Sequence, residues 1–214
     1  MKNKLILGFL LISSVSLAQM KQSTFVFGPK IGLQANHIAI VDNPGETSSK
    51  LSMQYQAGVF TRLNLGKLSL QPEAVFQVKG GNLVDPNQKL TFRYLSTPIL
   101  LGISPFEGFH LEAGPEFNWS LNQGWKKEGV EQYGPDLKKD NAFIVGARID
   151  MLDMFSMFSL NLRYAHGLYS FNTRIQNDGT PLDLRNRTFQ LGITYNFSEY
   201  YKWWKKYGIK KSKK

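Results

Sequence analysis

The stretch LSMQYQAGVFTRLNLGKLSLQPEAVFQVK, residues 51–79, decides the fold. On its first arm, mostly apolar residues occupy the odd positions from Leu51 to Leu63, and mostly polar residues lie between them. After the turn NLGK at 64–67 the alternation resumes and continues to Lys79. A period of two is typical of a β-strand with one apolar and one polar face. Each arm has about a dozen residues, which exceeds the usual strand of a soluble sheet and suffices to cross a membrane.

The same period recurs along the chain and predicts eight strands. Their expected ranges are 25–40, 51–63, 68–79, 90–103, 109–121, 141–151, 157–170 and 187–197. The connections alternate between long and polar (41–50, 80–89, 122–140 and 172–186) and short (64–67, 104–108 and 152–156). An up-and-down order brings all long loops to one end and all short turns to the other, which is the pattern of outer-membrane barrels.

We therefore predict an all-β fold, an eight-stranded antiparallel up-and-down transmembrane β-barrel over residues 20–197. After residue 20, no apolar run approaches the roughly 20 residues of a membrane helix. The nearly balanced charges of the polar faces, their glycines, which leave room for long side chains, and the aromatic residues near both strand ends place the apolar face outside. The alternative is a soluble lipocalin-like barrel with an apolar interior.

Charged residues on the polar faces are predicted to form a network that fills the lumen. They are Lys30, Arg62, Glu73, Lys79, Glu112, Glu116, Arg148, Asp150 and Arg163. Eight strands enclose an interior just wide enough for side chains, which argues against an aqueous channel. His110 shares this face with Glu112 and suggests a metal or acid–base site, but no second His lies near in sequence. We favour a hydrogen-bond network and expect no catalytic residue, metal or cofactor.

Both ends of the chain differ from the barrel. Residues 1–19 have the charged start, apolar stretch and small residues of a secretory signal peptide, and a short membrane anchor is the alternative. Residues 198–214 carry a net charge of +6 and Lys2 and Lys4 add +2 to the chain's +10, so the body, at +2, is near neutral and gives no argument for nucleic-acid binding. In this tail, a membrane surface or an envelope partner is the expected contact of Tyr200, Tyr201, Lys202, Trp203, Trp204, Lys205 and Lys206. A disordered solubilising tail is the alternative.

Five motifs occur in a characteristic order: GPKIGLQAN (28–36), YLSTPILLG (94–102), LEAGPEFNWSL (111–121), LNLRYAHGL (160–168) and FQLGITYNF (189–197). With them, residues 19–197 resemble the PorT-type outer-membrane β-barrel family, a porin-like family of Bacteroidota. The resemblance implies an eight-stranded membrane barrel and little about activity. The family's namesake supports protein secretion and gliding, a role that we do not transfer, because fold does not fix function.

Our functional prediction is a non-enzymatic protein of the cell outer membrane, exported through its signal peptide and surrounded by outer-membrane lipids. Envelope proteins would bind its loops 122–140 and 172–186 or its tail 198–214, and nucleic acid is not an expected partner. One alternative is a small porin-like pore. Another is a lipid-modifying enzyme that would use His166 and Ser170, although their spacing matches no known motif.

The sorting of the loops predicts that the long ones lie outside the cell. The chain has no cysteine, so a single cysteine introduced at Asp178 can be labelled selectively. It should react with an impermeant maleimide on whole cells, because residues 172–186 would face the medium. A cysteine at Glu107, in a short turn, should react only after lysis. The reverse pattern of labelling would contradict the predicted topology.

Overall fold

The structure, a computed structural model, describes residues 23–40, 49–83, 88–127, 130–132, 140–151, 155–169, 171–173, 182–198 and 201. The predicted signal peptide and nearly all of the predicted tail lie outside these ranges, so both stay predictions. Within the described ranges, no helix has the length and apolar character needed to span a membrane.

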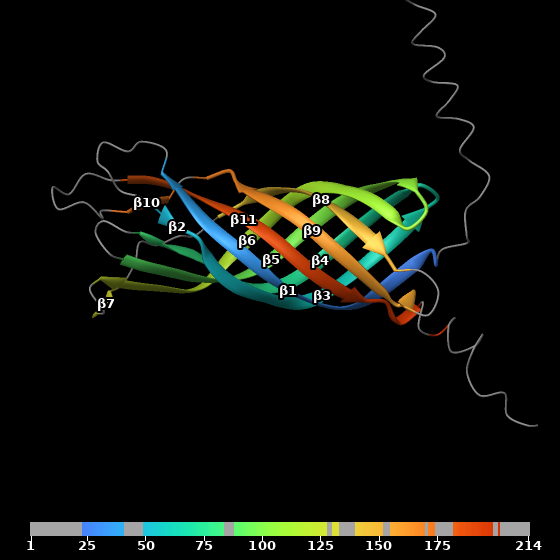
Figure 1. The fold of residues 1–214 in the computed structure, drawn as a ribbon, viewed down its shortest axis with the longest axis horizontal. Coiled ribbons are helices and arrows are strands. Elements are labelled where there is room, and N and C mark those ends of the chain that lie inside the picture. Colours follow the sequence, from blue (N-terminus) through green and yellow to red (C-terminus); the bar gives the residue numbers. More distant parts are fainter. Residues whose placement is uncertain are drawn as a thin grey trace, which may run out of the picture.

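Eight long antiparallel strands close into a barrel (Figure 1). They are β1 (Phe25–Ile40), β3 (Ser52–Leu65), β4 (Leu68–Leu83), β5 (Gln88–Phe106), β6 (Phe109–Lys127), β8 (Ala142–Asp150), β9 (Phe158–Gly167) and β11 (Leu182–Tyr195). Each pairs with the next in chain order, and β1 pairs with β11 to close the sheet. The predicted all-β, eight-stranded, up-and-down barrel is confirmed.

Short strands extend the wall at the long-loop end of the barrel (Figure 1). β2 (Ser49–Lys50) pairs with β4, β7 (Val130–Gln132) pairs with β6, and β10 (Phe171–Thr173) pairs with β11. The predicted boundaries were wrong here, because strands take up parts of every long connection: 49–50, 80–83, 88–89, 122–127, 130–132, 172–173 and 182–186. Ladder hydrogen bonds join backbones whatever the side chains are, so a strand continues where the alternation of the sequence fades.

At the opposite end, the strand ladder also runs further than the sequence indicates. β5 continues to Phe106, which leaves only Glu107 and Gly108 in the turn that we expected over 104–108. Gly108 has a φ of 71°, a left-handed conformation that glycine adopts without steric cost. A two-residue hairpin turn of this kind needs positive φ, and Gly108 supplies it.

The predicted orientation of the two faces is confirmed. Outward positions are apolar and exposed, as at Ile31 (63% exposed) and Leu101 (67%), whereas Glu116 and Arg148 on the inner face are fully buried. Aromatic rings contact one another in a row near the short-turn end, with 5.9 Å between the ring centroids of Phe25 and Phe27 and 5.5 Å between those of Phe27 and Phe197. An apolar band edged by aromatic rings is the surface that a bilayer covers.

Glycines on the inner face have a different main role from the one that the sequence suggested. We expected them to leave room for long side chains. A β-carbon added at Gly114 would instead lie 2.0 Å from the carbonyl oxygen of Ile99, and one at Gly58 would lie 2.2 Å from that of Ala74. These positions therefore allow the backbones of neighbouring strands to approach closely, which a narrow, strongly twisted barrel requires.

Candidate functional site

The candidate site is the interior of the barrel, where charged side chains from most of the strands meet. All nine predicted lumen residues lie on the inner face, and each forms an ion pair with at least one other. Eight of them are buried, and the side chain of Asp150 is 18% exposed. Strict alternation along each strand brings these residues inside, since positions two apart share a face.

Glu73 on β4 is the centre of the first part of this network. Its Oε2 atom lies 2.7 Å from Lys30 Nζ of β1, and its Oε1 atom lies 2.8 Å from Arg163 NH1 of β9. β4 and β9 are four strands apart in either direction around the barrel, so they form opposite walls. The pair of Glu73 and Arg163 therefore spans the lumen.

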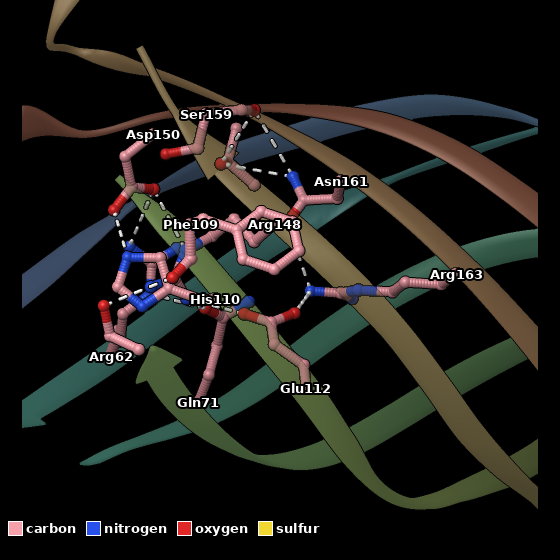
Figure 2. A network of polar contacts seen from close by, with 12 residues as sticks. Arg62, Gln71, Phe109, His110, Glu112, Arg148, Asp150, Ser159, Asn161 and Arg163 are labelled. Carbon is pink, nitrogen blue, oxygen red and sulfur yellow. Dashed lines mark hydrogen bonds and ion pairs between the residues drawn. The ribbon is translucent and has the colours of Figure 1, made fainter. Parts of the chain in front are cut away.

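Glu112 on β6 continues the network from the same arginine. Its Oε2 atom lies 2.8 Å from Arg163 NH2, and its Oε1 atom lies 2.5 Å from Arg148 NH1 of β8 (Figure 2). Arg163 thus holds two carboxylates with two different nitrogen atoms, a charge-assisted geometry that only a guanidinium provides. Side chains from β1, β4, β6, β8 and β9 form one connected set.

Asp150 binds the remaining members of the set near the short-turn end (Figure 2). Its carboxylate lies 3.0 Å from Arg148 Nε, 2.9 Å from His110 Nε2 and 3.9 Å from Arg62 NH1. His110 therefore contacts Asp150 and not Glu112, the neighbour that the sequence suggested. No group of three or more His, Cys, Asp or Glu side chains suited to a metal ion occurs among the described residues.

A second set of polar contacts lies towards the long-loop end. Lys79 Nζ lies 2.8 Å from Glu116 Oε1 and 5.7 Å from the centre of the Tyr94 ring. The side-chain amide of Gln77 donates to Glu116 and, at 3.1 Å, to Asn118 Oδ1. The Gln77 amide thus supplies a hydrogen bond to a carboxylate that the barrel wall shields from water.

Asp140 belongs to this second set, although the sequence placed it in the loop 122–140. It precedes β8, is 2% exposed, and accepts a hydrogen bond of 2.7 Å from Asn186 Nδ2 at its Oδ2 atom. Burial raises the pKa of its carboxyl group above the ordinary value. The sequence contains a signal for this position: Ile144 and Arg148 are even-numbered and face inward, and the same alternation extended back to position 140 turns Asp140 inward. With Asp140, five carboxylates face five basic groups in the described lumen.

Other residues that the sequence singled out are less fully described. His166 is half-buried on β9, and its ring centroid lies 6.2 Å from that of Tyr164. Ser170 lies outside the described residues, so its predicted relation to His166 is untested. Of the tail, Ser198 donates a hydrogen bond of 2.9 Å to the Phe25 carbonyl oxygen, and Tyr201 is exposed. The contacts predicted for Tyr200, Lys202, Trp203, Trp204, Lys205 and Lys206 concern residues that are not described.

Replacing Glu112 with Gln should destabilise the barrel by about 3–5 kcal/mol, because Arg148 and Arg163 would each lose an anionic partner in a buried site. Urea-induced unfolding in detergent measures this change. The matched control is Glu107→Gln, since Glu107 is an exposed carboxylate in the turn between β5 and β6. Equal unfolding midpoints for the two variants would show that the ion pairs of Glu112 contribute nothing to stability.

Comparison with solved structures finds several proteins that align with most of this chain at low sequence identity. Neisserial surface protein A aligns with a TM-score of 0.51 and 8% identity over 82% of this chain and 98% of that protein. Ail of Yersinia pestis aligns with a TM-score of 0.47 and 12% identity, over 82% of this chain and 100% of Ail. OprG of Pseudomonas aeruginosa aligns with a TM-score of 0.47 and 11% identity, over 81% of this chain and 95% of OprG. The likeness to Neisserial surface protein A is one of fold alone.

A family model for the outer membrane protein beta-barrel domain matches residues 17–172, well over half of the chain. No curated protein matches this chain. The match agrees with the closed sheet, the apolar outer surface and the charged interior. The chain therefore belongs to the family of outer membrane protein β-barrel domains.

Proposed function

We propose that this protein is a non-enzymatic outer-membrane barrel with a closed lumen, and that it serves as an interaction or assembly component of the envelope. The observation that carries this proposal is the contact between Glu73 and Arg163. It joins opposite walls of the barrel with 2.8 Å between Oε1 and NH1. From two further strands, Lys30 binds Glu73 and Glu112 binds Arg163.

A pore would require these groups to separate. Glu73 and Arg163 are each bound to two charged partners, and all four residues involved are at most 5% exposed. Breaking such a buried pair costs several kcal/mol, which opposes the passage of hydrated ions. The interior of an eight-stranded barrel also leaves little space beyond its side chains. The lumen is thus better suited to hold the barrel rigid than to conduct solutes.

On this proposal, envelope partners bind at the two ends of the barrel. At one end, residues 122–140 and 172–186 connect strands whose ladders rise beyond the body of the sheet, with β7 and β10 added at the rim (Figure 1). At the other end, Ser198 ties the start of the tail to Phe25 of β1. A tail that starts on the barrel wall would remain close to the lipid headgroups, where aromatic and lysine side chains are stabilised.

We further propose that the chain is of the PorT type and reaches the outer membrane through the signal peptide at residues 1–19. The order of the five sequence motifs supports the assignment. Three of them contribute charged residues to the lumen network: GPKIGLQAN contains Lys30, LEAGPEFNWSL contains Glu112 and Glu116, and LNLRYAHGL contains Arg163. The motifs would thus mark the residues that close the barrel interior.

Planar-bilayer recordings test the closed lumen. The purified wild-type protein should give no steady ionic current. The double variant Glu73→Ala with Arg163→Ala should conduct, because it removes both side chains of the contact that joins opposite walls. The variant Glu107→Ala, which changes an exposed turn residue, should stay silent. Steady currents from the wild-type protein would refute the proposal in favour of a pore.

Crosslinking in the native envelope tests the interaction role of the tail. A chain that ends after Ser198 should still fold, because β11 ends at Tyr195 and already pairs with β1. It should lose those crosslinked neighbours that depend on residues 199–214, and a variant with Trp203 and Trp204 changed to Ser should lose them too. A charge-preserving control replaces Lys210 and Lys211 with Arg and should retain them. If all crosslinked neighbours persist in the truncated chain, the tail has no binding role.

A further inference from the structure

Several charged side chains in the lumen have a buried atom without a hydrogen-bond partner. Among the described residues near the short-turn end, the charged groups with an unpartnered atom are donors: Arg62 NH2, Arg148 NH2 and Arg163 Nε. Towards the long-loop end, they are acceptors: Glu116 Oε2 and Asp140 Oδ1. Buried polar atoms are normally hydrogen-bonded, so each such atom calls for an explanation. Unpartnered guanidinium donors in one place indicate a missing acceptor.

The charge count near the short-turn end points the same way. We define the turn-side cluster as the connected set of Lys30, Arg62, Glu73, Glu112, Arg148, Asp150 and Arg163. It has four cationic side chains and three carboxylates, so its net charge is +1 with His110 neutral. Water molecules could accept hydrogen bonds from the arginines but would leave this charge uncompensated.

Asp140, the fifth carboxylate of the described lumen, is too far from the turn-side cluster to neutralise its positive charge. Asp140 precedes β8, and Arg148 lies eight residues further along the chain. At about 3.3 Å per residue this separates them by roughly 26 Å. Lys79 and Glu116 neutralise each other within their own pair. The excess positive charge near the short turns therefore has no counter-ion among the described residues.

Arg62 and Arg148 are two of the cationic side chains of the turn-side cluster, and they share acceptors (Figure 2). Both donate to the same acceptor, Gln71 Oε1, at 2.5 Å from Arg62 Nε and 3.2 Å from Arg148 NH1. Both also approach Asp150 Oδ1, at 3.9 Å and 3.0 Å. Two guanidinium groups thus lie side by side and share acceptors, and each has an NH2 group left without a partner.

We propose that the lumen of this protein contains an anion site, in which a small monovalent anion of the size of chloride binds the NH2 groups of Arg62 and Arg148. One negative charge matches the net charge of the turn-side cluster. The anion is small because both arginines are at most 2% exposed. It enters beside Asp150, whose partly exposed side chain marks the way to the solvent at the short-turn end. Arginine is well suited to this role, because its guanidinium keeps its charge and offers several fixed donors.

Thermal unfolding of the full-length protein in detergent tests the site with chloride as the probe. The Tm is measured in sodium chloride and in sodium gluconate of equal ionic strength, since gluconate is too large for a buried site. Chloride should raise the Tm in a saturable way, by about 5 °C or more at a hundred times Kd. A Tm that is the same in the two salts from 1 to about 500 mM would overturn the proposal.

Two variants locate the effect. Arg62→Gln removes one positive charge and brings the cluster to neutrality, so its Tm should no longer depend on chloride. The matched control is Asp140→Asn, a charge-neutralising change in the other half of the lumen, which should keep the full dependence. A chloride effect that survives in Arg62→Gln, or disappears in Asp140→Asn, would place the anion elsewhere and overturn the assignment.

Anomalous diffraction gives a test that does not depend on the folding of any variant. Crystals of the wild-type protein grown in sodium bromide should show a bromide peak within hydrogen-bond distance of Arg62 NH2 and Arg148 NH2. The absence of a peak there, at a bromide concentration above the Kd measured for chloride, would refute the site.

Discussion

Arg163 contacts Glu73 across the full width of the barrel, and the rest of the interior is arranged around this pair. An ionised group in a narrow lumen lacks most of its hydration, so it must be matched by an opposite charge at short range. Arg163 meets this need with two carboxylates, and each carboxylate then recruits a further cation: Lys30 at Glu73 and Arg148 at Glu112. The network follows from one requirement, which is that no buried charge is left alone.

Such a network contributes more to the choice of structure than to net stability. Replacing buried ion pairs with apolar side chains is often neutral or stabilising, whereas removing one partner is costly. In this barrel the apolar alternative would also weaken the distinction between the two faces of each strand. A shift of one residue in register would turn Glu73 or Arg163 towards lipid and apolar residues into the lumen. The inward charges therefore fix the register of every strand that carries them.

Much of this arrangement could be predicted from the sequence, because alternation is a local property. The period of two, seen first at Leu51–Lys79 and repeated along the chain, identifies the strands and assigns each residue to a face, and so it predicts that Glu73, Glu112 and Arg163 lie in the lumen. The pairing of these residues could not be predicted in the same way. Glu73 and Arg163 are 90 residues apart, and their contact depends on the number of strands and the tilt of the closed sheet.

The ends of the strands were harder to predict for a related reason. Outside the bilayer both faces of a strand meet water, so polar residues continue a ladder without any alternation, as in the extension of β6 to Lys127. Asp140 was missed because its polar neighbours resemble a loop, although it has the inward parity of β8. Sequence alternation thus identifies the part of each strand that crosses the membrane, and it does not mark where a strand ends beyond the membrane.

Charge is balanced over the whole described lumen but not within each half. The turn-side cluster carries one excess positive charge, and the set around Lys79, Glu116 and Asp140 carries one excess negative charge. At a separation of about 26 Å and an effective dielectric constant of about 20, the attraction between them is roughly 0.6 kcal/mol. That is small beside the cost of an uncompensated buried charge, so each half has to be neutralised locally. Burial supplies one route at Asp140, where the raised pKa favours the protonated form. Arginines do not release their protons at physiological pH, so proton loss from Arg62, Arg148 or Arg163 does not neutralise the short-turn half, and the proposed anion would supply the negative charge there.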